Sequence, residues 1–215
     1  MARVAIIGGH GKIALRLAKI LSDRGDKVSA IIRNPAHHDD VEATGADPVV
    51  ADVENLDTAQ IASVLADHDA VVWSAGAGGG DPKRTMAVDR DAAIRSMDAA
   101  ASAGANRYVM VSYFGARPDH GVPEDNSFFT YAEAKSAADS HLVDSDLQWT
   151  ILGPSALTDE PGTGQIAVGG DRAAGDQVSR DNVALVAAAV LADPATTGKR
   201  IEFNDGDTPI GDALA

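Results

Sequence analysis

The chain has 215 residues, of which 45% are hydrophobic, so it can bury a full core as one α/β domain. Its formal net charge of −14 repels phosphate backbones and anionic membranes, and we therefore expect neither a nucleic acid nor a membrane as partner. The absence of cysteine excludes disulfides, thiolate zinc sites and thiol nucleophiles, and we assign no metal ligand.

Short apolar runs alternate with longer helical patterns along the whole chain, which favours a parallel sheet covered by helices. Several strands are continuous apolar runs, as expected when both faces of the sheet are covered. The sequence therefore predicts an α/β fold with a doubly wound, mostly parallel sheet of the Rossmann type. We expect strands at 4–7, 28–32, 48–51, 70–73, 107–112, 148–152 and 200–203, and helices at 12–24, 57–65, 127–143 and 182–191 with a long one ending near 103.

One long segment, residues 153–177, is rich in glycine and proline and is predicted to be irregular. A loop of this length is more typical of a lid or binding segment than of a plain connection. The chain is expected to form a single domain over residues 1–215. Met1 leads directly into the first strand and no apolar run approaches the ~20 residues of a membrane helix, so we expect a soluble, cytoplasmic protein of undetermined oligomeric state.

The glycine-rich turn after the first strand predicts a dinucleotide site. Gly8 suits a positive φ at the tight turn, Gly11 lacks a β-carbon that would block a diphosphate, and Ala14 lets the helix sit close to the sheet. The start of this helix offers free N–H groups to the phosphates. The cofactor-binding residues expected in the turn are Gly8, Gly9, His10, Gly11, Lys12 and Ile13.

The end of the second strand favours NADP(H) over NAD(H). NAD-binding chains normally carry Asp or Glu at this place, whereas this chain has Arg33 and Asn34, and a guanidinium suits a 2′-phosphate. Asp52 and Val53 after the third strand are candidates for contact with the adenine, or form a helix N-terminus. The small residues at the end of the fourth strand let a ligand lie against the backbone, and they are Ser74, Ala75 and Gly76.

A tyrosine and a lysine supply the predicted chemistry. Tyr131 and Lys135 are four residues apart, so both project from one face of a helix, where the ammonium is expected to lower the pKa of the phenol. Ser112, at the end of the fifth strand, is a candidate hydrogen-bond donor to a substrate oxygen. These three residues are the predicted catalytic set.

Four motifs together resemble the short-chain dehydrogenase/reductase superfamily, and within it the atypical NmrA-like and biliverdin/flavin-reductase-like proteins. They are GGHGKIA at 8–14, VSY at 111–113, YAEAK at 131–135 and WTILGP at 149–154. The resemblance implies that Tyr131 donates a proton, Lys135 binds the nicotinamide ribose, Ser112 orients the substrate and Pro154 packs near the nicotinamide. The asparagine of the usual proton relay is missing, because residues 86–90 are MAVDR.

Aromatic residues gather around the proposed acid and predict an apolar substrate pocket containing Tyr113, Phe114 and Phe128, unless these rings simply fill the core. The sequence thus favours an NADPH-dependent reductase of a small carbonyl, quinone-like or flavin-like acceptor. Two alternatives remain: a non-catalytic NADP(H)-binding redox sensor or regulatory protein, and a nucleotide-sugar epimerase or dehydratase.

Overall fold

The computed structural model describes residues 1–78, 81–170 and 176–215. The strands in these ranges are β1 (Arg3–Ile7), β2 (Lys27–Ile32), β3 (Asp47–Val50), β4 (Ala70–Trp73), β5 (Arg107–Val111), β6 (Gln148–Pro154), β7 (Ala156–Thr158), β8 (Gln165–Val168), β9 (Gln177–Ser179), β10 (Lys199–Asp205) and β11 (Thr208–Pro209). The α-helices are α1 (Lys12–Asp23), α2 (His38–Glu42), α3 (Thr58–Leu65), α4 (Pro82–Thr85), α5 (Ala93–Ala103), α6 (Phe129–Val143), α7 (Arg180–Ala192) and α8 (Ile210–Ala213).

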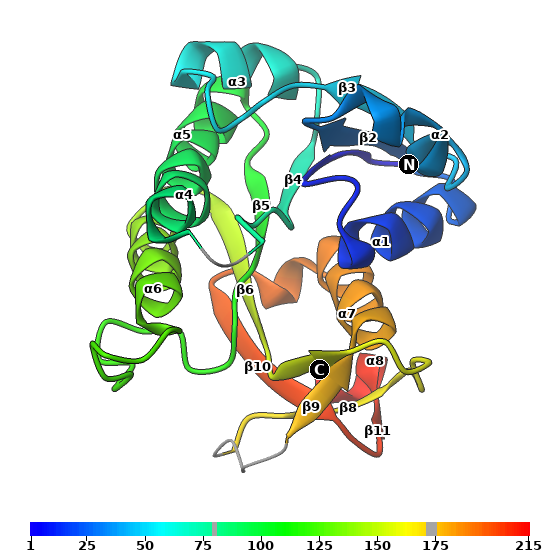
Figure 1. The fold of residues 1–215 in the computed structure, drawn as a ribbon. Coiled ribbons are helices and arrows are strands. Elements are labelled where there is room, and N and C mark those ends of the chain that lie inside the picture. The colour runs from blue at the N-terminus through cyan, green and yellow to red at the C-terminus, as the bar shows by residue number, and fades with distance from the viewer. Residues whose placement is uncertain (79–80, 171–175) are drawn as a thin grey trace.

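In the described part of the chain, nine strands form one sheet in the order β11-β8-β10-β6-β5-β4-β1-β2-β3 (Figure 1). The strands from β10 to β3 are parallel to their neighbours, whereas β8 is antiparallel to β10 and β11. The predicted doubly wound, mostly parallel α/β sheet is confirmed.

Helices cover both faces of this sheet, which is why its central strands are apolar throughout. On one face α1 and α7 pack against each other and against alternate strand residues such as Ile6 and Val72. On the other face lie α3, α5 and α6 (Figure 1). They cover the intervening residues, including Ile7 and Trp73. The apolar stripe of α1 follows a helical period, with Ala14, Leu17, Ala18 and Leu21 fully buried.

The strand order reverses at β1, and this reversal positions the site. The chain proceeds outward from β1 to β2 and β3, and then returns to place β4 on the other side of β1. The N–H of Ser74 donates to the carbonyl of Ile7 over 2.9 Å, so the carboxyl ends of β1 and β4 lie together. Ligands of such sheets bind in the crevice at this point.

The structure differs from the sequence prediction in two segments. The long helix ending at Ala103 consists of α4, a π-helix over Met86–Ala92, and α5. The stretch 153–177 is not wholly irregular: β6 extends to Pro154, and β7 and β8 lie within the stretch. These strands have only three and four residues and pair with the distant β9 and β10, so no local pattern predicts them.

The short strands β9 and β11 are also absent from the prediction for the same reason. The helices α2 and α8 are missed because five and four residues are too few to show a helical period. No helix in the described ranges is long and apolar enough to cross a membrane.

Candidate functional site

The glycine turn is built so that only glycine fits it. Gly8 has φ of +85°, and a Cβ there would lie 2.6 Å from the Cα of Ala75. A Cβ at Gly9 would lie 2.7 Å from the Cβ of Ala30. Gly11 caps α1 without a side-chain hydrogen bond, so the N–H groups of the first helical turn remain available for an anion.

A cavity of about 360 Å³ lies at the carboxyl ends of β1, β2, β3 and β4. A free helix N-terminus, close-packed glycines and a concave site of this kind together fit the diphosphate and adenosine of a dinucleotide. The predicted cofactor-binding residues that line the cavity are Gly8, His10, Gly11, Arg33, Asn34, Asp52, Val53, Ser74, Ala75 and Gly76.

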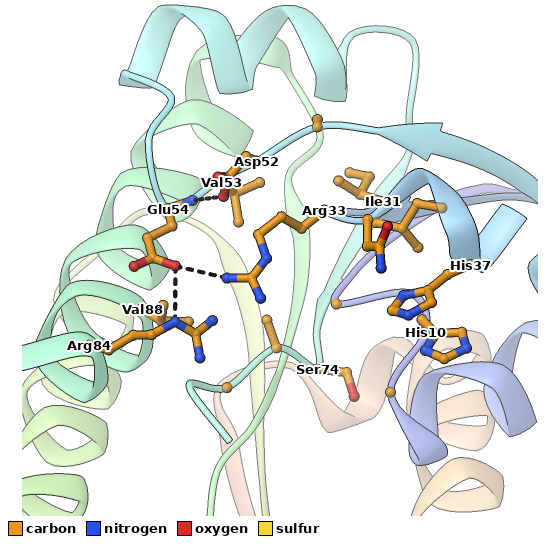
Figure 2. A pocket seen from close by; sticks show the side chains of 17 residues that line it. His10, Ile31, Arg33, His37, Asp52, Val53, Glu54, Ser74, Arg84 and Val88 are labelled. Carbon is orange, nitrogen blue, oxygen red and sulfur yellow. Dashed lines mark hydrogen bonds and ion pairs between the residues drawn. The ribbon is translucent and has the colours of Figure 1, made fainter. Parts of the chain in front are cut away.

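Two further charged residues, Glu54 and Arg84, line this cavity and were not predicted. Figure 2 shows Arg33 extending across the cavity toward Glu54, with Arg84 approaching the same carboxylate from α4. One oxygen, Glu54 Oε2, accepts from Arg33 Nη1 and from Arg84 Nε, each over 3.3 Å. Two guanidinium groups therefore share one carboxylate beside the predicted adenosine position.

Other predicted cofactor residues have partners of their own. The rings of His10 and His37 stack, with centroids 3.6 Å apart (Figure 2). The Nε2 of His10 lies 2.8 Å from Asp40 Oδ2. Asp52 accepts from Asn55 Nδ2 over 2.8 Å within a turn. Lys12 donates to Asp159 over 2.6 Å and does not line the cavity, and its contact with a cofactor stays a prediction.

A second cavity, of about 750 Å³, adjoins the first and shares the wall formed by Ser74, Ala75 and Gly76. The predicted residues Ile13, Ser112, Phe128 and Tyr131 line it. A ligand that lies in the first cavity and extends past this wall therefore reaches the phenol and the serine.

Tyr131 is held as a protonated phenol. Burial raises its pKa, and the carboxylates of Asp89 and Asp139 raise it further. The expectation that Lys135 lowers this pKa is wrong for this structure, because the fully buried Lys135 ammonium points elsewhere. It donates to the carbonyl of Val111 over 2.9 Å and lies 3.0 Å from the sulfur of Met110.

Ser112 is tied to a buried carboxylate that the sequence analysis did not identify. Its Oγ donates to Asp139 Oδ2 over 2.7 Å, and the same oxygen accepts from Arg200 Nη1 over 2.9 Å. Asp139 is completely buried. Because the single hydroxyl proton is used in this bond, Ser112 presents an acceptor lone pair to the cavity, and Tyr131 remains the hydroxyl donor of the predicted catalytic set.

A second buried carboxylate, Asp89, comes from the π-helix. Its Oδ2 accepts from the N–H of Ala77 over 3.0 Å, and it lines the larger cavity. Burial raises the pKa of Asp89, whereas the Ala77 N–H and the charges of Lys135 and Arg84 lower it. The wider turns of a π-helix are often found at functional sites, and here they turn a carboxylate toward the cavity.

The aromatic cluster forms only in part. The rings of Tyr113, Phe128 and Tyr131 contact one another, with centroids 5.1 to 5.8 Å apart. Of the predicted substrate residues, however, only Phe128 lines a cavity in the described part of the chain, and Tyr113 and Phe114 do not. The other predicted residues that line neither cavity are Gly9, Lys12, Lys135 and Pro154. Pro154 ends β6, and its carbonyl accepts from the N–H of Phe114 over 2.9 Å.

The missed residues Glu54, Arg84, Asp89, Asp139 and Arg200 belong to different elements that only the folded chain brings together. One weak signal exists: Lys135 and Asp139 are spaced by four residues on one predicted helix, a spacing typical of ion pairs. No comparable local signal links Glu54 to Arg84.

Comparison with known proteins gives a consistent result. A Bacillus subtilis protein named as an uncharacterised sugar epimerase, YhfK, is 36% identical over 99% of this chain and 98% of its own length. The structure named as a putative NAD-dependent epimerase/dehydratase from Bacillus halodurans is 32% identical over 100% of this chain and 99% of that one, with a TM-score of 0.92. The oxidoreductase ylbE from Lactococcus lactis is 27% identical over 99% and 94%, with a TM-score of 0.87.

A family model described as NAD(P)H-binding matches residues 8–194, and this range contains every residue that lines the two cavities. The matched range begins at Gly8 of the glycine turn, in agreement with the geometry that fits a diphosphate there. The resemblance inferred from the four sequence motifs is thereby confirmed, and the chain belongs to the family of NAD(P)H-binding proteins.

Proposed function

We propose that the protein is an NADPH-dependent reductase of a small, uncharged acceptor, with Tyr131 as the proton donor. The observation that carries the proposal is the shared wall of the two cavities, because it connects the dinucleotide cavity with the phenol. When bound, the reduced nicotinamide supplies a hydride, that is, one proton with two electrons, to the acceptor. The acceptor then requires one further proton.

The raised pKa of Tyr131 supports this direction of reaction. A carbonyl that has accepted a hydride becomes an alkoxide, which is a far stronger base than a phenolate and takes the phenol proton readily. Oxidation of an alcohol, in contrast, requires the phenolate form, which burial and the nearby carboxylates disfavour. The site is therefore better suited to reduction than to oxidation.

The preference for NADPH rests on the cations at the adenosine end of the first cavity. Arg33 is half-exposed and lines the cavity, so its guanidinium is accessible to a 2′-phosphate. A guanidinium binds a phosphate by two parallel hydrogen bonds and is the side chain best matched to it.

The lining of the second cavity limits the acceptor to uncharged compounds. Among its described lining residues are Asp81 and Asp89 but no Lys, Arg or His, so an acidic acceptor would find no cationic partner. Val111, Phe128 and Leu157 supply apolar contact. Small neutral aldehydes, ketones and quinones fit this lining best.

The proposal is tested by following NADPH absorbance with a panel of neutral aldehydes, quinones and flavins. Tyr131→Phe should lower kcat by about 10²- to 10⁴-fold, the usual contribution of general acid catalysis, while the Kd for NADPH stays the same. Tyr113→Phe is the matched control, because that ring touches Tyr131 but lines neither cavity in the described residues. Binding of NADPH without turnover of any acceptor would refute the reductase and leave the sensor.

A nucleotide-sugar epimerase is the second candidate, favoured by the names of the Bacillus relatives. This reaction begins with oxidation of a sugar hydroxyl and needs Tyr131 as a base. Interconversion of nucleotide sugars by the purified protein with catalytic NAD⁺ would establish it, and its absence across a panel would exclude the sugars tested.

A further inference from the structure

On the basis of the proposed function, we infer that Glu54 weakens binding of the 2′-phosphate of NADPH and supports binding of NADH. Glu54, Arg33 and Arg84 then together set the ratio of the affinities for NADPH and NADH. The inference starts from a single carboxylate oxygen that lies 3.3 Å from both guanidinium groups in the cavity (Figure 2).

The three residues are positioned by separate elements. Arg33 follows β2, Glu54 lies in the turn after β3, and Arg84 is on α4. Arg84 is held in place because its Nη1 also donates to the carbonyl of Ala77, while its Nε faces Glu54. The two arginine side chains are 56% and 32% exposed and the glutamate is 23% exposed, so all three remain accessible from the cavity.

The charges explain why Glu54 matters to a 2′-phosphate. A phosphate monoester carries close to two negative charges at neutral pH, which would balance the two guanidinium charges. Glu54 already neutralises one of them from a position between the two. The phosphate must therefore displace the carboxylate or bind beside it, and both alternatives weaken NADPH binding.

The same carboxylate suits the unphosphorylated cofactor. NAD-binding chains hold the adenosine ribose hydroxyls with an acidic residue at the end of the second strand, where this chain has Arg33. Glu54 brings a carboxylate to that neighbourhood from the turn after the adjacent β3. It can accept hydrogen bonds from two free ribose hydroxyls without competing with a phosphate.

The test is calorimetric titration of NADPH and NADH into the wild-type protein and three variants. Glu54→Gln should tighten NADPH binding about fivefold to tenfold and weaken NADH binding about threefold or more. Arg84→Gln should weaken NADPH binding about tenfold with little effect on NADH. Asp67→Asn is the matched control, because it removes an exposed charge that pairs with Arg3 at the opposite end of β1, and should change neither Kd.

Adenosine 2′,5′-bisphosphate and adenosine 5′-monophosphate isolate the subsite from the nicotinamide, and the same opposite shifts are expected for them. If Glu54→Gln leaves the ratio of the two Kd values within twofold of wild type, the inference is overturned. This outcome differs from failure of the proposed function, in which the dinucleotides bind but no acceptor is reduced.

Discussion

Replacement of Asp139 by asparagine tests the buried network behind Ser112. The carboxylate oxygen Oδ2 accepts from Ser112 and from Arg200, and the side chain is only 1% exposed. Asparagine has nearly the same shape but no charge, and it offers one acceptor oxygen together with an NH₂ group that cannot accept. The substitution therefore removes a charge without leaving a cavity.

The expected loss of stability follows from these contacts. Removing one partner of a fully buried ion pair costs about 3–5 kcal/mol. Arg200 retains 29% exposure and can be hydrated, and the amide oxygen keeps one of the two hydrogen bonds, so we expect about 2–3 kcal/mol for Asp139→Asn. For a chain of this length, that corresponds to a decrease in Tm of about 5–10 °C.

The substitution should also change the pH dependence of turnover. Asp139 is among the groups that raise the pKa of Tyr131, and with burial it raises the pKa of Tyr113 to about 12. A phenol that donates a proton is active below its pKa and inactive above it. Loss of the negative charge lowers the pKa of Tyr131, so the alkaline limit of kcat should move to lower pH.

Urea unfolding and a pH profile of kcat measure the two effects separately. Asp98→Asn is the control, since Asp98 forms an exposed pair with His141 and such pairs contribute little. An unfolding free energy of Asp139→Asn within 0.5 kcal/mol of the control, or an unchanged alkaline limit in a stable variant, would refute the reasoning.

Two predictions concern the turn and the π-helix. Gly8→Ala should destabilise by about 2–5 kcal/mol, because a positive φ and a 2.6 Å approach to Ala75 both oppose a Cβ. Gly25→Ala is the control, because Gly25 also has a positive φ of +89° but a Cβ there would meet no atom within 4 Å, so it should show only the smaller backbone cost. Equal Tm values for the two variants would contradict the proposed clash between a Cβ at Gly8 and Ala75. The pKa of Asp89 is raised above its ordinary 3.8, so the folded protein binds the carboxyl proton of Asp89 more tightly than the unfolded chain does. The folded state therefore loses stability as the pH rises from 3.8 through the raised pKa. Asp89→Asn keeps an acceptor for the Ala77 N–H and should remove that loss, making the variant more stable relative to wild type at pH 7 than at pH 4 in urea titrations; a difference independent of pH would argue against a raised pKa.

Much of the fold was predictable because it depends on local patterns. Apolar runs of four to six residues, each followed by a helix with a buried stripe, specify a parallel sheet whatever the details of packing. The glycine turn was equally predictable, since a positive φ at Gly8 and close packing at Gly9 leave glycine as the residue that fits. The short strands β7, β8, β9 and β11 were not, because their partners are distant in sequence.

The sequence by itself determined the sheet, the glycine turn and the position of Tyr131 on a helix, since these follow from periodicity, backbone conformation and spacing along one element. Only the tertiary structure decided the electrostatics of the site. It turned Lys135 toward Val111, set Asp139 behind Ser112 and placed Glu54 between two arginines. Burial and charge at a site depend on groups from several elements, and no single segment of sequence contains that information.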